Sequence, residues 1–167
     1  EQRLLWLNGA HIRKLDLADL YKKVADFWPA EAKEYDDDYK KKVLGLVQER
    51  LKYFAELPQL TIFFFKDLPV NPELWQNNKQ LKKLEPGEIK NLLEQSKSAL
   101  ESSNFSADDL SAELNELLEK TGQKPGILFS LIRIATTQAP ASPGLAETLA
   151  VLGKDVSLRR IEAMLGT

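Results

Sequence analysis

The sequence contains no cysteine and only one histidine among its 167 residues. Without cysteine the chain forms no disulfide and no cysteine-ligated zinc centre, and it has no thiol nucleophile. It also lacks an apolar run of about 18 residues and a charged-then-apolar leader, so we expect neither a membrane span nor a secretory signal. The absence of cysteine suits a cytosolic or organelle-interior protein, and of these we expect a cytoplasmic one. The sole methionine is Met164, and we therefore expect an excised fragment or a processed product.

Residues that could form an active site are also scarce. His11 has no identifiable catalytic companion, and there is no glycine-rich phosphate-binding loop. Asp36, Asp37 and Asp38 are consecutive, but successive carboxylates on a helix point in different directions, and negative charge is favoured at a helix N-terminus in any case. We therefore expect no catalytic residue, no metal site and no cofactor in this chain.

Basic residues do not dominate the composition. The chain has 23 lysines and arginines against 25 aspartates and glutamates, which gives a net charge of −2. This balance argues against a non-specific nucleic-acid binder, which needs a strong basic field to displace counterions from phosphates. It still allows a protein that reads splayed single-stranded bases. Residues 71–120 lean acidic, so RNA would meet the basic C-terminal part, which contains Lys124, Arg133, Lys154, Arg159 and Arg160.

Apolar residues recur with helical spacing along nearly the whole chain, and no segment alternates cleanly with a period of two. The sequence therefore predicts an all-α fold. The run from Thr61 to Phe65 has the β-branched and aromatic content of a strand, but Pro58 suits the first turn of a helix, and we predict a helix there. The other predicted helices cover residues 17–28, 36–56, 72–84, 88–101 and 107–121, and three more are opened by Pro125, Ser142-Pro143 and Asp155.

Several helix ends carry local signals. The segment Ser106–Asp109 nearly matches a capping box, with aspartate in place of glutamate or glutamine. Gly122 would end the helix that this segment begins, and Gly153 and Gly166 would close the last two helices. The turn at residues 122–125 is where we expect two lobes of the protein to meet.

Four segments form a recognisable series along the chain. They are Leu5-Trp6-Leu7-Asn8-Gly9 with His11-Ile12-Arg13; Gln48-Glu-Arg50-Leu-Lys52; Leu57-Pro-Gln-Leu-Thr61 with Phe63-Phe-Phe65; and Lys124 to Gly153 followed by Ser157-Leu-Arg-Arg-Ile161. Their order and spacing resemble the non-catalytic half of bacterial-type glutamyl-tRNA synthetases. The His-Ile-Gly-His nucleotide-binding motif of class I synthetases is absent, because His11 is followed by Ile-Arg-Lys.

This resemblance implies a two-lobed helical bundle, the anticodon-binding α-helix cage of that family. Residues 1–30 would form a junction that contacts the tRNA stem, and residues 31–121 and 122–167 would be two anticodon-binding subdomains. The implied function is recognition of tRNA-Glu by the C-terminal region of a glutamate–tRNA ligase, with tRNA-Gln left open as a second partner. ATP and Mg²⁺ would serve an N-terminal catalytic domain of the same polypeptide, so this chain alone should be inactive.

Arg133 is the first candidate binding residue. It lies in the apolar stretch Leu131–Ala135 and needs a partner, because burying an unpaired guanidinium is costly. It could pair with a carboxylate such as Glu147, or donate a bidentate hydrogen bond to a base or a phosphate. The resemblance favours the RNA role. After the arginine helix the family has Thr-Gly, where this chain has Thr137-Gln138.

The turn Ser142-Pro143-Gly144-Leu145 is the second candidate. It is first of all a helix start, and its backbone N–H groups could also bind anions or base acceptors. In that function Leu145 would pack against a base. The resemblance makes Arg50 a further candidate, for reading the last anticodon base, although a solvated helix face is the ordinary interpretation of its surroundings.

The resemblance also suggests a contact with the tRNA stem near the start of the chain, through Asn8, His11 and Arg13. The competing hypothesis for the whole chain is a helical protein-interaction module without RNA binding. In that case the basic C-terminal face would contact an acidic partner.

Overall fold

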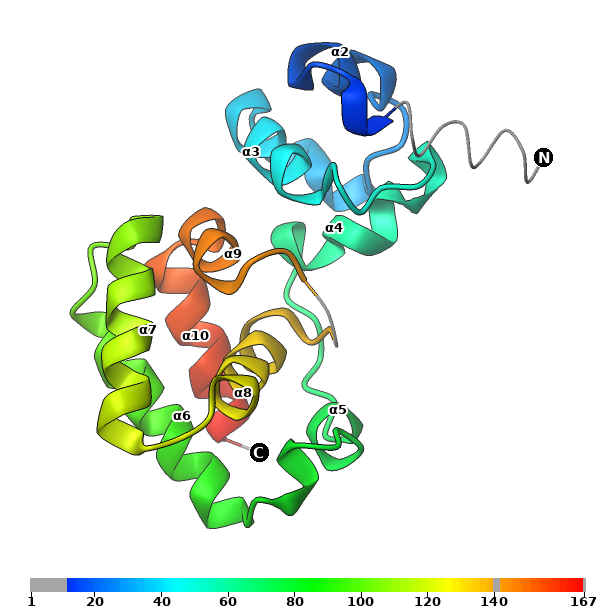
Figure 1. The fold of residues 1–167 in the computed structure, drawn as a ribbon. Helices are drawn as coiled ribbons and strands as arrows, with labels where there is room; N and C mark the ends of the chain where they lie inside the picture. The colour runs from blue at the N-terminus through cyan, green and yellow to red at the C-terminus, as the bar shows by residue number, and fades with distance from the viewer. Residues whose placement is uncertain (1–11, 140–141, 167) are drawn as a thin grey trace. The chain divides into compact units, whose positions relative to one another are not determined.

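The computed structural model describes residues 12–139 and 142–166, and these residues form helices without any strand (Figure 1). The all-α class expected from the sequence is confirmed. The chain divides into two compact units, residues 1–66 and residues 67–167. Within the described part, no helix is both long enough and apolar enough to cross a membrane.

Besides a short helical segment at residues 12–14, the described part of the first unit contains three α-helices. These are α2 (Leu17–Lys23), α3 (Asp37–Val47) and α4 (Leu57–Phe65), with short 3₁₀ helices at Ala30–Glu34 and Phe54–Glu56. Each helix contributes apolar side chains to one core. The buried apolar residues are Ile12, Leu20, Val24, Ala32, Val43, Leu44, Val47, Leu51, Leu57, Phe63, Phe64 and Phe65.

The segment that could have been a strand is helical, as predicted. Pro58 lies in the first turn of α4, where a backbone N–H has no helical partner in any case. Thr61 is fully buried, and its hydroxyl donates to the Leu57 carbonyl oxygen at 2.7 Å. The polar atom is therefore satisfied within the helix, and the aromatic side chains of Phe63 and Phe64 fill the core.

The prediction of one long helix over residues 36–56 is wrong. Helix α3 ends at Val47, and residues 48–50 form a turn. The side-chain amide of Gln48 donates to the carbonyl oxygens of Ile12 and Leu15, each at 2.9 Å, and these bonds hold the turn against the start of the unit. The helix over residues 17–28 also ends early, at Lys23, and residues 24–26 form a turn.

The second unit holds α5 (Glu73–Gln76), α6 (Pro86–Glu101), α7 (Ala107–Thr121), α8 (Pro125–Thr137), α9 (Leu145–Leu152) and α10 (Lys154–Leu165). Helix α10 packs against α6, α8 and α9, and α7 packs against α6 and α9 (Figure 1). One apolar core joins these helices. Its fully buried members are Leu81, Leu100, Leu110, Leu128, Leu131, Ile132, Leu149 and Ile161.

Two of the helix-end predictions in this unit are confirmed in detail. The Ser106 hydroxyl accepts a hydrogen bond from the Asp109 N–H at 3.2 Å at the start of α7. Gly122 follows that helix with φ at 70°, in the left-handed region where glycine carries no steric penalty. The aspartate differs from the usual glutamate: it accepts from the Ser103 hydroxyl and from the Asn104 N–H.

The helix predicted over residues 72–84 is broken into α5 and a 3₁₀ turn at Leu81–Lys83. The Asn78 side chain accepts hydrogen bonds from the N–H groups of Gln80 and Leu81, at 2.9 and 3.0 Å. Asparagine can compete with the helical backbone in this way, so the chain turns and buries Leu81.

The boundary between the compact units falls at a different point of the chain from the one expected. The division falls between Lys66 and Asp67, whereas the turn at residues 122–125 joins α7 to α8 inside the second unit. Helix propensity and turn residues mark element ends but do not say which helices share a core. The assignment of RNA-binding roles to residues 1–30, 31–121 and 122–167 stays a prediction.

Candidate nucleic-acid interface

Arg133 projects from the last turns of α8, where its neighbours Leu131, Ile132 and Ile134 are buried. The arginine itself is half-buried. Its Nε atom donates to the Ser142 hydroxyl oxygen at 2.8 Å, across the loop that connects α8 to α9. The structure thus brings together two residues that the sequence proposed as separate parts of one binding site.

The turn before α9 is largely closed into the protein. Ser142 and Pro143 are buried, and Gly144 is exposed at the N-cap position. The Ser142 hydroxyl donates to the Pro143 carbonyl oxygen at 2.9 Å, and the Thr148 hydroxyl donates to the same oxygen at 3.3 Å. These bonds fix the serine so that its oxygen faces Arg133. Leu145 is buried in the core of the second unit.

The Glu147 carboxylate lies over the start of α9. A Cβ atom at Gly144 would be only 2.1 Å from Glu147 Oε2, so glycine gives this side chain room to fold back. The N-terminus of a helix favours negative charge, and Glu147 is exposed and can move. An anionic ligand that binds the backbone N–H groups at the start of α9 would therefore compete with the Glu147 carboxylate.

Three other basic residues of the C-terminal part, Arg159, Arg160 and Lys154, are engaged within the protein. Arg159 Nη2 lies 2.8 and 2.9 Å from the two carboxylate oxygens of Asp67, and Arg160 Nε lies 3.0 Å from one of them. The hydrogen bond from Arg159, followed by that from Arg160, lowers the pKa of the Asp67 carboxyl below its ordinary value. Lys154 Nζ donates to the Glu101 carbonyl oxygen at 2.9 Å.

The remaining candidates belong to the first unit. Arg50 is exposed in the turn after α3, not on a long helix, and its neighbour Gln48 has the structural role described above. Arg13 is exposed in a short helical segment. Asn8 and His11 lie outside the described residues.

Sequence reasoning missed two residues in the contacts at the C-terminal end of α8, Gln138 and Asp67. Gln138 ends α8 with φ at 51°, a left-handed conformation that is uncommon for residues other than glycine. Its side-chain Oε1 accepts from the Asn71 N–H at 2.9 Å. The departure from the family's Thr-Gly was the available signal, because a glycine after a helix commonly marks a left-handed residue. Asp67 gave no signal in the sequence.

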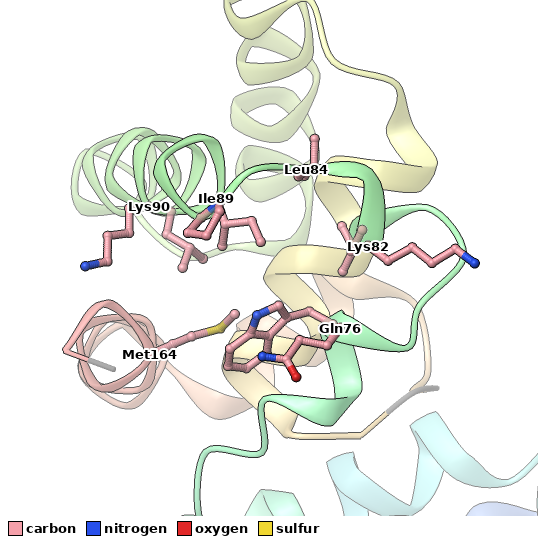
Figure 2. A pocket seen from close by; sticks show the side chains of 10 residues that line it. Gln76, Lys82, Leu84, Ile89, Lys90 and Met164 are labelled. Carbon is pink, nitrogen blue, oxygen red and sulfur yellow. The ribbon is translucent and has the colours of Figure 1, made fainter.

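A cavity of about 220 Å³ lies elsewhere in the second unit, and sequence reasoning did not anticipate it. Figure 2 shows Met164 reaching into it, with Lys82 and Lys90 on opposite sides and their ammonium groups directed outward. Its walls are otherwise mainly apolar and include Trp75, Leu84 and Ile89. None of the sequence-predicted site residues lines this cavity.

The fold and the Arg133–Ser142 pair define an all-α protein with a candidate RNA-reading turn. Residues 18–165 match the family model described as the anticodon binding domain. The chain therefore belongs to the anticodon-binding domain family.

Relatives of known name extend this assignment. The chain is 30% identical over 166 residues to the glutamate–tRNA ligase of Bacillus licheniformis and 35% identical over 167 residues to that of Herpetosiphon aurantiacus. Each alignment covers 95% of this chain and 33% of the relative, so the chain spans about a third of the length of these curated relatives.

A solved structure supports the fold. The crystal structure of a glutamate tRNA ligase from Elizabethkingia meningosepticum, in complex with its amino acid, matches with a TM-score of 0.84 at 19% identity. The match covers 99% of this chain and 32% of that protein.

Proposed function

We propose that this chain is the C-terminal anticodon-binding region of a glutamate–tRNA ligase and that it reads anticodon bases of tRNA-Glu. The family match and the relatives supply the class of ligand. The hydrogen bond from Arg133 Nε to the Ser142 hydroxyl is the observation that carries the assignment of the reading residue.

The physical reason is the shape of the guanidinium. Arginine presents its N–H donors in a planar, rigid fork, and one fixed hydrogen bond at Nε sets the plane of the whole group. With Nε held by Ser142, the Nη edge faces a defined direction and can make the paired hydrogen bonds that recognise a base edge or a phosphate. Preorganisation of this kind reduces the side-chain entropy lost on binding.

The turn from Ser142 to Leu145 contributes in a second way. Helix α9 begins at Leu145, and the N–H groups of its first turn have no partner within the helix. An acceptor atom of a splayed nucleotide could bind there once Glu147 moves away. Because Leu145 is buried, it supports the turn from beneath, and the proposal gives it no direct contact with a base.

The rest of the proposal concerns the whole enzyme. A catalytic domain in the same polypeptide would attach glutamate to tRNA with ATP and Mg²⁺, and binding of the anticodon here would orient the acceptor end toward it. Arg50 and the stem-contact residues Asn8, His11 and Arg13 are secondary candidates. Whether tRNA-Gln is also accepted is a question for direct comparison of the two tRNAs.

A titration of the isotope-labelled chain with tRNA-Glu and tRNA-Gln anticodon stem-loops tests this function, with an unrelated hairpin of equal length as the control. We expect NMR shifts to cluster on Arg133 and residues 142–145 with the tRNA-Glu loop. Arg133→Ala should weaken binding at least about tenfold, which corresponds to the loss of one bidentate contact. Lys120→Ala removes an exposed positive charge from the end of α7 and should leave binding nearly unchanged.

The titration also separates the competing hypothesis. A protein-interaction module would give equal or absent shifts with the cognate and control hairpins. Equal binding of the cognate loop by Arg133→Ala and by the unmodified chain would refute the role of this arginine.

A further inference from the structure

The segment that leads into α5 is tied to the end of α8 by polar contacts at two points. Arg160 bridges the first: its Nε donates to Asp67 Oδ1 at 3.0 Å, and its Nη1 donates to the Thr136 carbonyl oxygen at 2.7 Å. At the second point, the Asn71 N–H donates to Gln138 Oε1 at 2.9 Å. Only 10% of the Arg160 side chain is exposed, against 55% of the Asp67 side chain, so the bridge is shielded from water on the arginine side and open to it at the carboxylate.

A cavity lies beside these contacts. It has a volume of about 250 Å³, and its walls include Leu68 and Val70 from the segment before α5 and Thr137 from α8. Val70 itself packs against the apolar core of the second unit. The polar bridges add a more directional restraint to this packing, because a hydrogen bond constrains the positions of its donor and acceptor atoms.

The last turn of α8 is in turn connected to Arg133. The Thr137 hydroxyl donates to the Arg133 carbonyl oxygen at 2.7 Å and accepts from the Ala139 N–H at 3.2 Å. Ala139 begins the loop that leads to Ser142, the partner of the Arg133 side chain. A displacement of this turn would consequently move both the backbone of the arginine and the residue that orients its guanidinium.

We infer that Asp67 is a positioning residue for anticodon reading. Through Arg160 it fixes the C-terminal turn of α8 and so sets the direction in which Arg133 presents its guanidinium. The inference rests on the proposed function, since it assigns a consequence for base reading. It goes beyond that function, because the Asp67 carboxylate would affect base reading through Arg160 without contacting the RNA.

Arg159 supplies a matched control in the same cluster. Its described hydrogen bonds go to the two oxygens of Asp67, and 58% of its side chain is exposed. Exposed ion pairs contribute little to stability. Loss of Arg159 removes a positive charge beside Asp67 but leaves the bridge from Asp67 through Arg160 to Thr136 in place.

The test compares Asp67→Ala, Asp67→Asn and Arg159→Ala with the unmodified chain. For each, Kd is measured for the tRNA-Glu anticodon stem-loop and for the same loop with one anticodon base replaced. The Nε–Hε NMR signal of Arg133 is recorded without RNA. Asp67→Ala should weaken cognate binding about three- to tenfold, the range expected when a coupling residue is lost.

The expected pattern is specific to positioning. Asp67→Ala should weaken binding of the replaced loop much less, so that the discrimination ratio falls, and it should shift the Arg133 signal. Asp67→Asn keeps an acceptor oxygen and should lie between Asp67→Ala and the unmodified chain. Arg159→Ala should stay within about twofold of the unmodified chain, as expected for an exposed ion pair.

The measurements are made where circular dichroism shows every variant folded, so a loss of stability alone leaves the discrimination ratio unchanged. An unchanged ratio together with an unchanged Arg133 signal in Asp67→Ala overturns the inference. If the unmodified chain does not bind the cognate loop, the proposed function fails instead, and the Arg133 signal still tests the structural link. Should Asp67→Ala not fold, Asp67→Asn and Arg160→Lys carry the same comparison, because a lysine ammonium cannot span both acceptors as the guanidinium fork does.

Discussion

The Ser142 hydroxyl oxygen accepts a hydrogen bond from Arg133 Nε at 2.8 Å while its own proton is directed to the Pro143 carbonyl oxygen at 2.9 Å. A single buried serine therefore connects the guanidinium to the backbone of the turn before α9. Substitutions can therefore test separately the orientation of the Arg133 guanidinium, which Ser142 sets, and its positive charge.

Ser142→Ala removes the orienting bond and keeps the charge. In this variant the partly buried Arg133 Nε–H loses the Ser142 hydroxyl as its acceptor, which should lower the free energy of unfolding by about 1–3 kcal/mol. Urea unfolding measures that loss, and titration with the anticodon stem-loop measures the effect on binding. Ser142→Thr keeps a hydroxyl and is the control. An Arg133 Nε–Hε signal that is the same in Ser142→Ala as in the unmodified chain would contradict the hydrogen bond.

Gly122→Ala tests the left-handed end of α7. With φ at 70°, alanine at this position meets the steric cost of the left-handed region, although nothing lies within 4 Å of the added Cβ. The free energy of unfolding should fall by about 1–2 kcal/mol. Gly87→Ala is the matched control, because it also adds a Cβ into open space but lies in the first turn of α6 without a positive φ. Equal unfolding midpoints for the two variants would count against this explanation.

The two compact units should respond separately to core truncation. Phe64→Ala removes a side chain that is 2% exposed in the first unit and should cost about 3–5 kcal/mol. Leu131→Ala, fully buried in the second unit, is the reciprocal variant and should cost about 2–5 kcal/mol. Hydrogen exchange followed residue by residue should show faster opening in residues 12–66 for the first variant and in residues 67–166 for the second. Faster exchange across both ranges in either variant would show that the units unfold together.

Asp67 should make the second unit more sensitive to acid. Because hydrogen bonds from Arg159 and Arg160 lower its pKa in the folded state, its stabilising effect is complete above the pKa of the unfolded chain, near about 3.9, and is lost as pH falls through the lower folded value. The stability difference between the unmodified chain and Asp67→Asn should therefore be constant near neutral pH and shrink below about pH 4. Urea unfolding between neutral and acidic pH measures the difference. A stability difference that persists in strong acid would mean that the negative charge of Asp67 is not its cause.

Helix ends that depend on local chemistry were predictable from the sequence. Ser106, Gly122 and Pro125 act on backbone groups within a few positions of themselves, so the pattern of residues contains the whole interaction. The end of α3 was not predictable in this way. It depends on Gln48 bonding to the carbonyl oxygens of Ile12 and Leu15, which lie 36 and 33 positions away along the chain.

The same distinction holds at the candidate interface. Arg133 and the Ser142 turn could be selected from the sequence, since an arginine in an apolar helix needs a partner and a Ser-Pro-Gly turn opens a helix. The sequence could not show that Ser142 is the partner of Arg133, because the bond depends on how the loop between α8 and α9 folds back. Glu147, the partner considered from the sequence, instead lies over Gly144.

Gln138 is a residue at which folding and recognition make opposite demands. Its left-handed backbone is unfavourable for a side chain, and its buried Nε2 has no hydrogen-bond partner among the described residues. Glycine would remove both costs and would also remove the bond from Asn71 that holds the end of α8. A screen for thermostable variants should therefore select glycine at this position. The selected protein would have a higher free energy of unfolding but a less ordered loop between α8 and α9, which is a stability–activity trade-off confined to one side chain.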